Sequence, residues 1–370
     1  MKKVGIDARL YSQTGVGTYL RNFIHELSVH PPKDITFYIY VLPTDEEKLF
    51  PLPSNFIIRK APYLWHSFSE QCAFLKILND DHLDLMHFTY FGYPVFYRRK
   101  FIATVHDLTP LLFKTGKAST KNPLIYGIKH FFFKHILRSQ IENAVSIITP
   151  TKTVKNQIIQ VYGSHLKDKI IPLHEGIGYE LAQTKENESL KFRYQKPFFI
   201  YVGNFYPHKN IKRLVEAFTG VMTWHQLILI GPRDYFATSI LQYIRQCNIE
   251  ARIIIVDNAT TPDLVFFYKH AQALIHPSLS EGFGLPIIEA AYFNLPIIAS
   301  NIPVFQELLK GRYVSFNPHD TTDIQNKIAN FISHPLNADY GSILAQYSFK
   351  IMAQQTLSLY HDALESKEKI

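Results

Sequence analysis

The most informative stretch of this 370-residue chain is HPSLSEGFGLPIIEAA, which occupies residues 276–291. The apolar residues 273–276 predict a buried strand, and the apolar positions after Pro286 predict a helix. Proline is tolerated at the first helical position, while Gly282 and Gly284 let the backbone approach a ligand closely. A strand, a glycine-containing loop and a helix in this order predict an α/β domain with a binding site at the loop.

The predicted helix start near Pro286 is suited to an anion, because the first N–H groups of a helix lack intrahelical partners. Glu281 lies just before these donors and Glu289 about one turn inside the helix. Two carboxylates beside a phosphate-sized site predict a ligand with hydroxyls at both ends and negative charge between them, as in a nucleotide-sugar. Spacing alone does not establish this, since Glu180 and Glu188 are also eight residues apart. The alternative for Glu289 is a surface carboxylate that stabilises the helix by about 0.3–1 kcal/mol.

The composition, 46% hydrophobic and 19% charged, predicts a globular chain, and the length predicts two domains. Cys72 and Cys247 are far apart in sequence, which indicates a reducing compartment without a disulfide framework. Asp7 and Arg9 interrupt the first apolar run, so we expect no signal peptide. No apolar stretch approaches the roughly 18 residues of a membrane span, and we therefore expect a cytoplasmic protein.

The net charge of +8 is uneven along the chain. Residues 1–175 contain 22 Lys and Arg against 14 Asp and Glu, whereas residues 176–370 contain 17 of each. Cations stand beside aromatic residues or other cations in the segments 98–100, 114–117 and 126–138. Such segments are typical of peripheral contact with an anionic membrane, here on its inner face; the alternative is a core helix with a solvated basic face. Nucleic acid is not expected, because no binding-module motif accompanies the charge.

The first half alternates strands and helices, which predicts a mostly parallel sheet covered on both faces. Its strands are expected at residues 4–10, 35–42, 56–59, 83–88, 101–105 and 145–149. Gly15 and Gly17 follow the first strand and precede a helix expected at 20–27; they form either a ligand-approach loop or only a tight turn. His87 and His106 stand at carboxyl ends of strands, where ligands bind in such sheets. A hydrogen-bonded structural role is the default for a lone histidine, and we expect it for His87.

The second half begins with a linker candidate at residues 178–196, which are rich in Glu, Lys, Gln and Asn. A second strand series is expected at residues 197–203, 227–230, 252–256, 273–276, 297–300 and 313–316. Lys209 lies before a helix expected at 211–218, where an ammonium group is suited to bind phosphate; the alternative is a solvated loop lysine. One last helix is expected over about 343–364.

Four motifs, at residues 15–19, 104–110, 203–210 and 276–290, resemble in this order those of the retaining glycosyltransferases of family 4 (GT4). The resemblance covers nearly the whole chain. It implies the GT-B fold, in which two Rossmann-like domains face each other across a cleft. The implied division is an acceptor-side domain 1–177, a linker 178–196, a nucleotide-sugar-binding domain 197–345 and a C-terminal helix 346–370 that crosses back to the first domain.

The resemblance also implies site residues. Those for donor binding are Gly15, Gly17, Asn204, Lys209, Gly282, Phe283, Gly284, Leu285 and Glu289. His106 and Glu281 are implied in catalysis, with His106 orienting the donor sugar and Glu281 holding it, while Glu289 holds the ribose hydroxyls. Asn204 stands where many GT4 members have arginine, so one of two usual phosphate cations is missing. Donor binding is therefore expected to depend more on Lys209 and on the amides of residues 282–285.

The implied function is a metal-independent, retaining hexosyltransferase. It transfers a hexose from a GDP- or UDP-sugar to a glycan or lipid-linked acceptor in bacterial surface-polysaccharide synthesis. Asn204 and the run Pro-His-Lys-Asn at 207–210 are also seen in mannosyltransferase-like members, which favours GDP-mannose. The chain has no Asp-x-Asp motif, in agreement with the expected independence of metal. The alternatives are a non-catalytic glycan-binding subunit and a nucleotide-sugar epimerase, which would release nucleotide without an acceptor.

Overall fold

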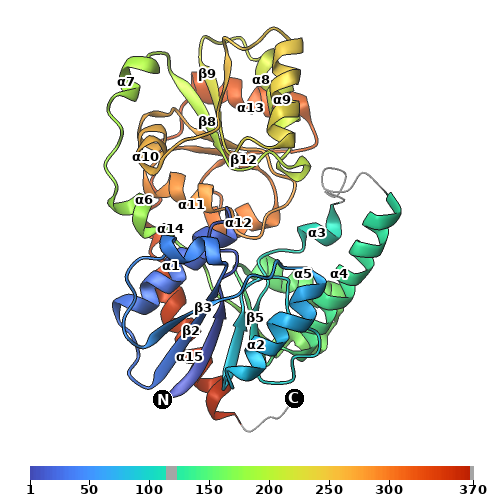
Figure 1. Cartoon of the computed structure of the whole chain (residues 1–370). Helices are drawn as coiled ribbons and strands as arrows, with labels where there is room; N and C mark the ends of the chain where they lie inside the picture. The colour runs from blue at the N-terminus through green and yellow to red at the C-terminus, as the bar shows by residue number, and fades with distance from the viewer. Residues whose placement is uncertain (114–122, 367–370) are drawn as a thin grey trace. The chain divides into compact units, whose positions relative to one another are not determined.

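The computed structural model of the chain describes residues 1–113 and 123–366, so the basic segment 114–117 lies outside the described residues. The chain divides into two compact units. Of the described residues, the first contains 1–111, 123–175 and 348–366, and the second contains 112–113 and 176–347. Each unit contains one parallel sheet with helices on both faces (Figure 1). The expected α/β class with two Rossmann-like domains is confirmed.

The sheet of the first unit has the strand order β3-β2-β1-β4-β5-β6-β7, and its pairings are parallel. Its strands are β1 Lys2–Asp7, β2 Ile35–Val41, β3 Phe56–Lys60, β4 Leu85–Phe88, β5 Phe101–Thr104, β6 Ser146–Thr149 and β7 Ile170–Pro172. Six of them match predicted strands, with ends that differ by a few residues. The strand β7 was not predicted, because it is short and ends in proline, a residue that is uncommon within strands.

The sheet of the second unit has the order β10-β9-β8-β11-β12-β13, again with parallel pairings. Its strands are β8 Phe198–Val202, β9 Gln226–Ile230, β10 Ile253–Val256, β11 Leu274–His276, β12 Ile297–Ser300 and β13 Val314–Phe316. All six match predicted strands. Along β8, Phe198 and Ile200 enter one core whereas Phe199 and Tyr201 enter the other. Because helices cover both faces, both sets of alternating side chains are apolar.

Helices connect the strands in both units. They are α1 Val16–Val29, α2 Leu75–Asp80, α3 Thr109–Leu112, α4 Pro123–Asn143, α5 Lys152–Tyr162, α6 Tyr179–Gln183, α7 Leu190–Arg193, α8 Ile211–Gly220, α9 Tyr235–Gln246, α10 Thr261–His270, α11 Leu285–Tyr292, α12 Pro303–Leu309, α13 Thr321–Ser333, α14 Gly341–Leu344 and α15 Phe349–Glu365. Side-chain oxygens of Thr151, Asp234 and Asp320 cap α5, α9 and α13, as is typical of these residues at helix starts. Within the described residues, no helix combines the length and apolarity needed to cross a membrane.

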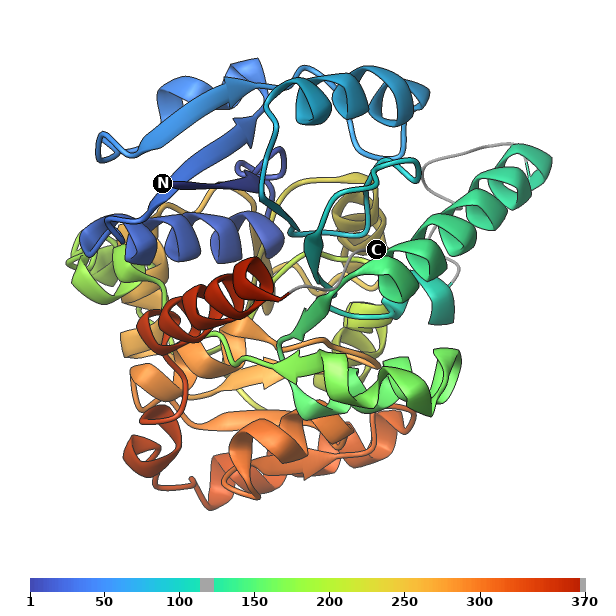
Figure 2. The same cartoon turned by 90° about the horizontal axis from the view of Figure 1, so that it is seen from below.

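The C-terminal segment differs from the single helix expected over 343–364. The helix α14 ends at Leu344 and α15 begins at Phe349, with Ser348 accepting a hydrogen bond from the N–H of Ile351. The helix α15 belongs to the first unit, where it packs against α1 and β4. Figures 1 and 2 both show it in red beside the blue helix α1. The chain therefore ends in the unit in which it begins.

Residues 178–196, for which the composition predicts a linker, contain α6 and α7 and belong to the second unit. Leu181 and Tyr194 are buried in its core, where Tyr194 contacts Phe267 edge-to-face at 5.1 Å. Most other side chains of the segment are polar and at least partly exposed. A few core contacts thus anchor a segment whose composition resembles that of a free linker.

Candidate active site

The two predicted motifs of the second unit meet at one edge of its sheet. The strand order changes direction between β8 and β11, and in open α/β sheets ligands bind outside the carboxyl ends of the strands at such a point. The loop 203–210 follows β8, and the loop 277–284 follows β11. The fold therefore brings together Lys209 and Glu281, which are 72 residues apart in sequence.

Glu281 is the centre of a buried hydrogen-bond group. Its Oε1 accepts hydrogen bonds from Lys209 Nζ at 2.6 Å, from Ser278 Oγ at 2.7 Å and from His276 Nε2 at 2.9 Å. Only 9% of Glu281 is exposed. Because a carboxylate only accepts hydrogen bonds, the contact requires the hydrogen of His276 on Nε2. The group combines an ion pair with two neutral donors on a single oxygen.

The charges of this group follow from its burial. Burial alone would raise the pKa of Glu281, but the Lys209 ammonium and the hydrogen bond from His276 outweigh it and hold the pKa well below its usual range. Burial lowers the pKa of His276 despite the neighbouring carboxylate. At neutral pH the group therefore contains an ionised Glu281 and a neutral His276. The Lys209 ammonium has three hydrogens, and the hydrogen bond to Glu281 uses one of them.

Hydrogen bonds join this group to the neighbouring loops. The N–H of Leu279 donates to the carbonyl of His208 at 2.7 Å. The amide of Asn210 donates to Pro277 O at 3.2 Å and to Pro318 O at 2.8 Å. Asn210 has a left-handed backbone (φ 61°) at the start of α8, a conformation that asparagine tolerates better than most residues. The loops after β8, β11 and β13 are thus held together by Asn210, to which the sequence interpretation gave no role.

The start of α11 has the geometry that the glycine pattern predicts. Gly284 precedes the helix with φ 93°, and a Cβ atom there would lie 3.0 Å from the Phe305 ring. Glycine is therefore required by both conformation and space. Leu285 is the first helical residue, and Gly282 is buried in the loop before it. These residues lie in the loop whose Glu281 binds Lys209.

Phe283 and Asn204 occupy different environments in these loops. The Phe283 side chain is buried and packs against the Tyr347 ring at 6.0 Å, so it is a core side chain. Asn204 follows Gly203, and its carbonyl accepts a hydrogen bond from Tyr201. Its side-chain Oδ1 is buried without a hydrogen-bond partner among the described residues. Asn204 therefore holds an unused acceptor, in a position where GT4 members often have a cation.

Glu289 belongs to a separate hydrogen-bond group. It lies in α11, and its Oε2 accepts a hydrogen bond from the Tyr268 hydroxyl at 2.6 Å. Burial raises the pKa of Glu289, and the bond from Tyr268 opposes this rise. Tyr268 is fully buried in α10, where its ring stacks on Phe293. Sequence reasoning missed Tyr268, because it stands in an apolar run that is typical of any core helix.

The first unit places Gly15 and Gly17 after β1, one of the two strands at which its sheet changes direction. Gly15 has φ 67°, and a Cβ atom on Gly17 would lie 2.7 Å from the Tyr11 carbonyl oxygen. That carbonyl also accepts a hydrogen bond from Arg21 at 2.7 Å. Backbone conformation at Gly15 and lack of space at Gly17 thus explain why glycine stands at these positions, independently of any ligand.

His106 is held by its own neighbours. Its Nε2 donates to the Thr89 carbonyl at 3.0 Å, and its Nδ1 lies 3.5 Å from Glu175 Oε1. The ring also contacts Tyr19 edge-to-face at 4.8 Å. Sequence reasoning missed Glu175 as a partner, because no local pattern links it to His106. His87 is fully buried with both nitrogens hydrogen-bonded, which agrees with the structural role expected for it.

A second buried ion group, which sequence reasoning also missed, surrounds Arg9. Its Nη2 lies 2.6 Å from Asp7 Oδ2 and 2.8 Å from Glu70 Oε1, and its guanidinium lies over the Phe74 ring. Burial raises the pKa of Glu70, and Arg9 opposes this rise. Asp7 and Arg9 were noted only as an interruption of the first apolar run. The distant Glu70 that completes the group has no local signal.

Two Rossmann-like units with motif loops at their switch points define the GT-B class of glycosyltransferase. Comparison with known families agrees with this class. A model described as glycosyl transferases group 1 matches residues 182–346, and one described as glycosyltransferase family 4 matches residues 14–179. The chain therefore belongs to the GT4-type glycosyltransferases.

Several known proteins are similar to this chain. O-antigen chain mannosyltransferase RfbU of Salmonella typhimurium is 27% identical over 298 residues, which cover 80% of this chain and 78% of RfbU. Serotype-specific mannosyltransferase WbdA of Escherichia coli is 25% identical over 238 residues, 61% of this chain but 28% of WbdA.

Solved structures share the fold. Sucrose-phosphate synthase from Thermosynechococcus elongatus has a TM-score of 0.79 at 18% identity, covering 98% of this chain and 99% of its own. Anabaena HepE, solved in complex with UDP-glucose, has a TM-score of 0.74 at 14% identity, covering 98% of this chain and 100% of its own.

Proposed function

We propose that the protein is a retaining hexosyltransferase that moves mannose from GDP-mannose to a glycan or lipid-linked acceptor during synthesis of a bacterial surface polysaccharide. The observation that carries the proposal is the buried group of Lys209, Glu281 and His276 beside the start of α11. The choice of mannose is supported by RfbU and WbdA, which are described as mannosyltransferases. The choice of GDP follows from this donor sugar.

The proposed chemistry is stabilisation of charge on the leaving group. As the bond between sugar and diphosphate breaks, negative charge develops on the departing phosphate oxygen. The Lys209 ammonium and the N–H groups at the start of α11 are suited to stabilise it, because preorganised donors need no reorganisation during the reaction. Glu281 holds the ammonium in place through the 2.6 Å contact. The proposal thus assigns to protein groups the task that a metal ion has in other enzymes.

The remaining residues are proposed to position the two substrates. Glu289, whose Oε2 already accepts from Tyr268, would accept from ribose hydroxyls with its other oxygen. In the first unit, Gly15, Gly17 and His106 would contact the donor sugar and the acceptor. Retention of configuration would follow if the acceptor attacks on the face from which the diphosphate leaves. The leaving phosphate oxygen would then take the acceptor proton, and no covalent protein nucleophile is required.

The donor proposal is tested by measuring nucleotide release from GDP-, UDP- and ADP-sugars in the presence of a mannose-terminated oligosaccharide acceptor. Lys209→Ala should lower kcat by about 10²–10³-fold, the usual loss when one preorganised donor is removed. Lys212→Ala is the matched control, since Lys212 lies in α8 with 65% of its side chain exposed. If no donor is turned over, or if Lys209→Ala equals wild type, the proposed function is wrong.

Dependence on the acceptor separates the two alternatives. A transferase releases nucleotide faster when the acceptor is added and lengthens it by one sugar, which mass spectrometry detects. An epimerase would release nucleotide equally well without acceptor. A non-catalytic glycan-binding subunit would bind the oligosaccharide and turn over none of the donors.

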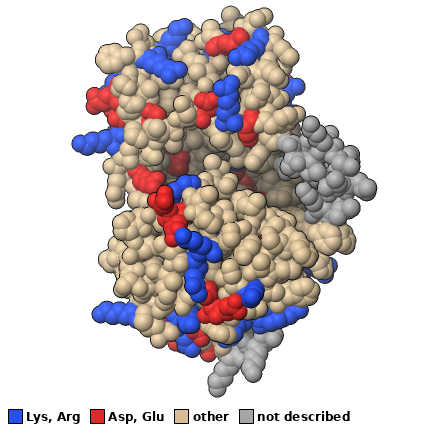
Figure 3. Space-filling model, viewed as in Figure 1, with Lys and Arg blue, Asp and Glu red and all other residues tan. Residues whose placement is uncertain are grey.

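We further propose that α4 contacts anionic membranes. It exposes Phe131 (68%) and Phe132 (58%), together with the cationic side chains of Lys134 and Arg138. Exposed aromatic and basic residues on one helix are suited to the headgroup region of an anionic bilayer. On the face seen in Figure 3, Lys and Arg are interspersed with Asp and Glu. The proposed contact is therefore assigned to α4 and not to the face of the first unit seen in Figure 3.

Co-sedimentation with vesicles tests this contact. Wild type should bind phosphatidylglycerol-containing vesicles at low salt and dissociate from them as the salt concentration is raised. It should not bind vesicles of pure phosphatidylcholine. The double variant Phe131→Ser/Phe132→Ser should lose most of this binding. Phe192→Ser, at an exposed phenylalanine of the second unit, should retain it. Absence of wild-type binding at low salt would contradict the proposal.

A further inference from the structure

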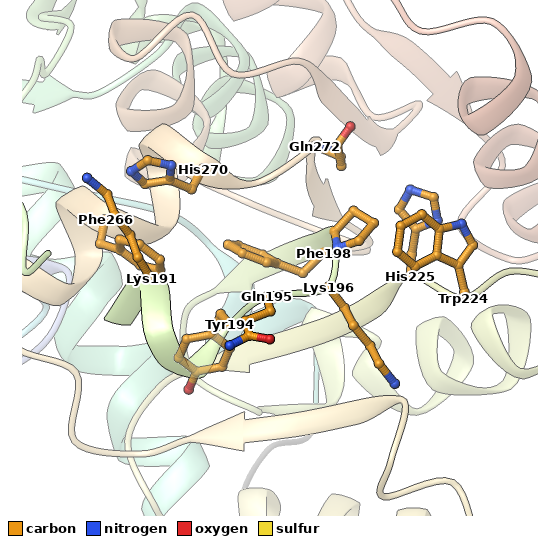
Figure 4. Close-up of a pocket in the computed structure, with 11 residues that line it drawn as sticks. Lys191, Tyr194, Gln195, Lys196, Phe198, Trp224, His225, Phe266, His270 and Gln272 are labelled. Atoms are coloured by element: carbon orange, nitrogen blue, oxygen red, sulfur yellow. The ribbon is translucent and has the colours of Figure 1, made fainter. Parts of the chain in front are cut away.

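The second unit has a pocket of about 740 Å³ at a place distinct from the Lys209 and Glu281 group (Figure 4). Its lining includes Phe198, the first residue of β8, whereas Lys209 lies in the loop that follows the last residue of that strand. At a rise of about 3.3 Å per residue, the length of β8 separates the two places by roughly 13 Å. The pocket therefore lies at the amino ends of the strands and is separate from the candidate donor site.

The floor of the pocket is buried and aromatic. Tyr194, Phe198 and Phe266 belong to the buried core, with ring centroids 6.0 Å apart for Tyr194 and Phe198 and 6.4 Å for Phe198 and Phe266. In Figure 4, Trp224 and His225 lie on one side of the pocket, opposite Phe266. Trp224 is 69% exposed, although burial would stabilise so large a ring. The pocket thus combines a buried aromatic floor with an exposed indole.

The rim of the pocket is polar, and its charged groups are only partly paired, because the exposed Lys196 lines it as well. Lys191 Nζ lies 3.4 Å from Glu186 Oε1, and His270 Nε2 lies 2.8 Å from Glu186 Oε2. Gln195 and Gln272 add amide groups, each of which both donates and accepts hydrogen bonds. Its volume lies within the range of about 300–1,000 Å³ that small-molecule sites have. Such a rim suits a hydroxyl-rich ligand, because hydroxyls can both donate to and accept from the amide groups.

We propose that this pocket is a second glycan site, which binds a neutral oligosaccharide. The apolar C–H face of a sugar ring would stack on Trp224, and its hydroxyls would bond to Gln272 and its neighbours. The inference rests on the proposed function, because the growing glycan is the neutral oligosaccharide that such an enzyme meets. Binding at a second point raises the effective concentration of a long acceptor near the enzyme. Long acceptors should therefore have a lower KM than short ones.

Isothermal titration with linear α-mannooligosaccharides of two to six sugars tests the site. Wild type should bind the longer oligosaccharides, and Trp224→Ala should weaken that binding at least tenfold. The chain has two tryptophans, so a fluorescence change on binding that disappears in Trp224→Phe assigns the signal to this ring. Met222→Ala is the matched control, since Met222 is fully exposed in the same connection but does not line the pocket. It should bind like wild type.

Each outcome decides something different. If wild type binds no oligosaccharide, or if Trp224→Ala binds as well as wild type, the second glycan site is refuted. If wild type binds no sugar and both Trp224→Ala and Met222→Ala change the sedimentation coefficient, the surface is a protein–protein contact. The inference is again wrong in that case. Donor turnover with a disaccharide acceptor should be unchanged in Trp224→Ala. Failure of wild-type donor turnover with intact oligosaccharide binding would instead count against the proposed function alone.

Discussion

The substitution Glu281→Gln removes the charge at the centre of the candidate donor site while keeping the size of the side chain. In the structure, one carboxylate oxygen accepts three hydrogen bonds and serves as counter-ion of Lys209. Hydrogen bonds to charged groups contribute about 1.5–3 kcal/mol and neutral ones about 0.5–1.5 kcal/mol, so each of the three loses about 1 kcal/mol. The total of about 3 kcal/mol agrees with the cost of about 3–5 kcal/mol for breaking a buried ion pair.

Thermal unfolding followed by calorimetry measures this loss. For a unit on the order of 170 residues, 1 kcal/mol corresponds to about 2–4 °C, so the Tm of the second unit should fall by roughly 6–12 °C. Glu188→Gln is the control, because Glu188 is exposed and belongs to the other glutamate pair with the same spacing. Its effect should stay below about 0.5 kcal/mol. Equal shifts for the two variants would refute the assigned role of the buried group.

The pH dependence gives an independent check. Because the pKa of Glu281 is held below its unfolded value of about 4.3, its stabilisation is present above about pH 4.3 and is lost as the pH falls below it. The difference in unfolding free energy between wild type and Glu281→Gln should therefore shrink by about 1.4 kcal/mol per pH unit below pH 4. A difference that is the same at pH 5 and pH 3 would contradict this reasoning.

Three further predictions concern backbone and buried groups. Tyr360→Phe removes a hydroxyl 2.6 Å from His87 Nδ1, so urea unfolding should show a loss of about 1–3 kcal/mol. Gly284→Ala places a side chain at φ 93° and close to Phe305, so it should cost about 1–2 kcal/mol and weaken donor binding, whereas Gly341→Ala should be nearly neutral. Burial lowers the pKa of His87 to about 3 from about 6.5 when unfolded. The stabilisation by neutral His87 is present above pH 6.5 and is lost as the pH falls toward 3. His87→Gln removes this titrating group, so between pH 6.5 and pH 3 the Tm of the first unit should fall less steeply in the variant than in wild type.

Much of the fold could be predicted because local sequence patterns indicate its strands and helices. The six strands of the second sheet are apolar runs that helical or polar segments separate, and Gly203 directly follows the end of one of them. The break between α14 and α15 could not be predicted, since residues 342–364 contain neither glycine nor proline and keep a helical apolar spacing. A distant contact accompanies the break: the Tyr347 hydroxyl donates to the Leu308 carbonyl at 3.0 Å.

The site was predictable only in part, for a related reason. Gly284 could be recognised because its left-handed backbone at a helix start is a local property. The partners of charged residues are instead set by the order of strands in the sheet. Lys209 was interpreted as a phosphate ligand and Glu281 as a sugar ligand, whereas the structure joins them in one ion pair. Glu175 beside His106 likewise depends on tertiary packing that no spacing in the sequence reports.

The ion pair of Lys209 and Glu281 changes how the candidate site must attract a diphosphate. A lysine with an ionised partner at 2.6 Å adds little net charge, and Asn204 supplies none where many relatives have arginine. Donor affinity should then depend mainly on oriented N–H groups and only weakly on salt, because screening acts on net charge. Asn204→Arg adds an uncompensated cation and should make donor affinity both tighter at 50 mM salt and more sensitive to salt. Titration calorimetry with GDP at 50 and 500 mM salt measures this. A steep salt dependence in wild type would show that Lys209 acts as an independent charge, which the buried geometry of Glu281 argues against.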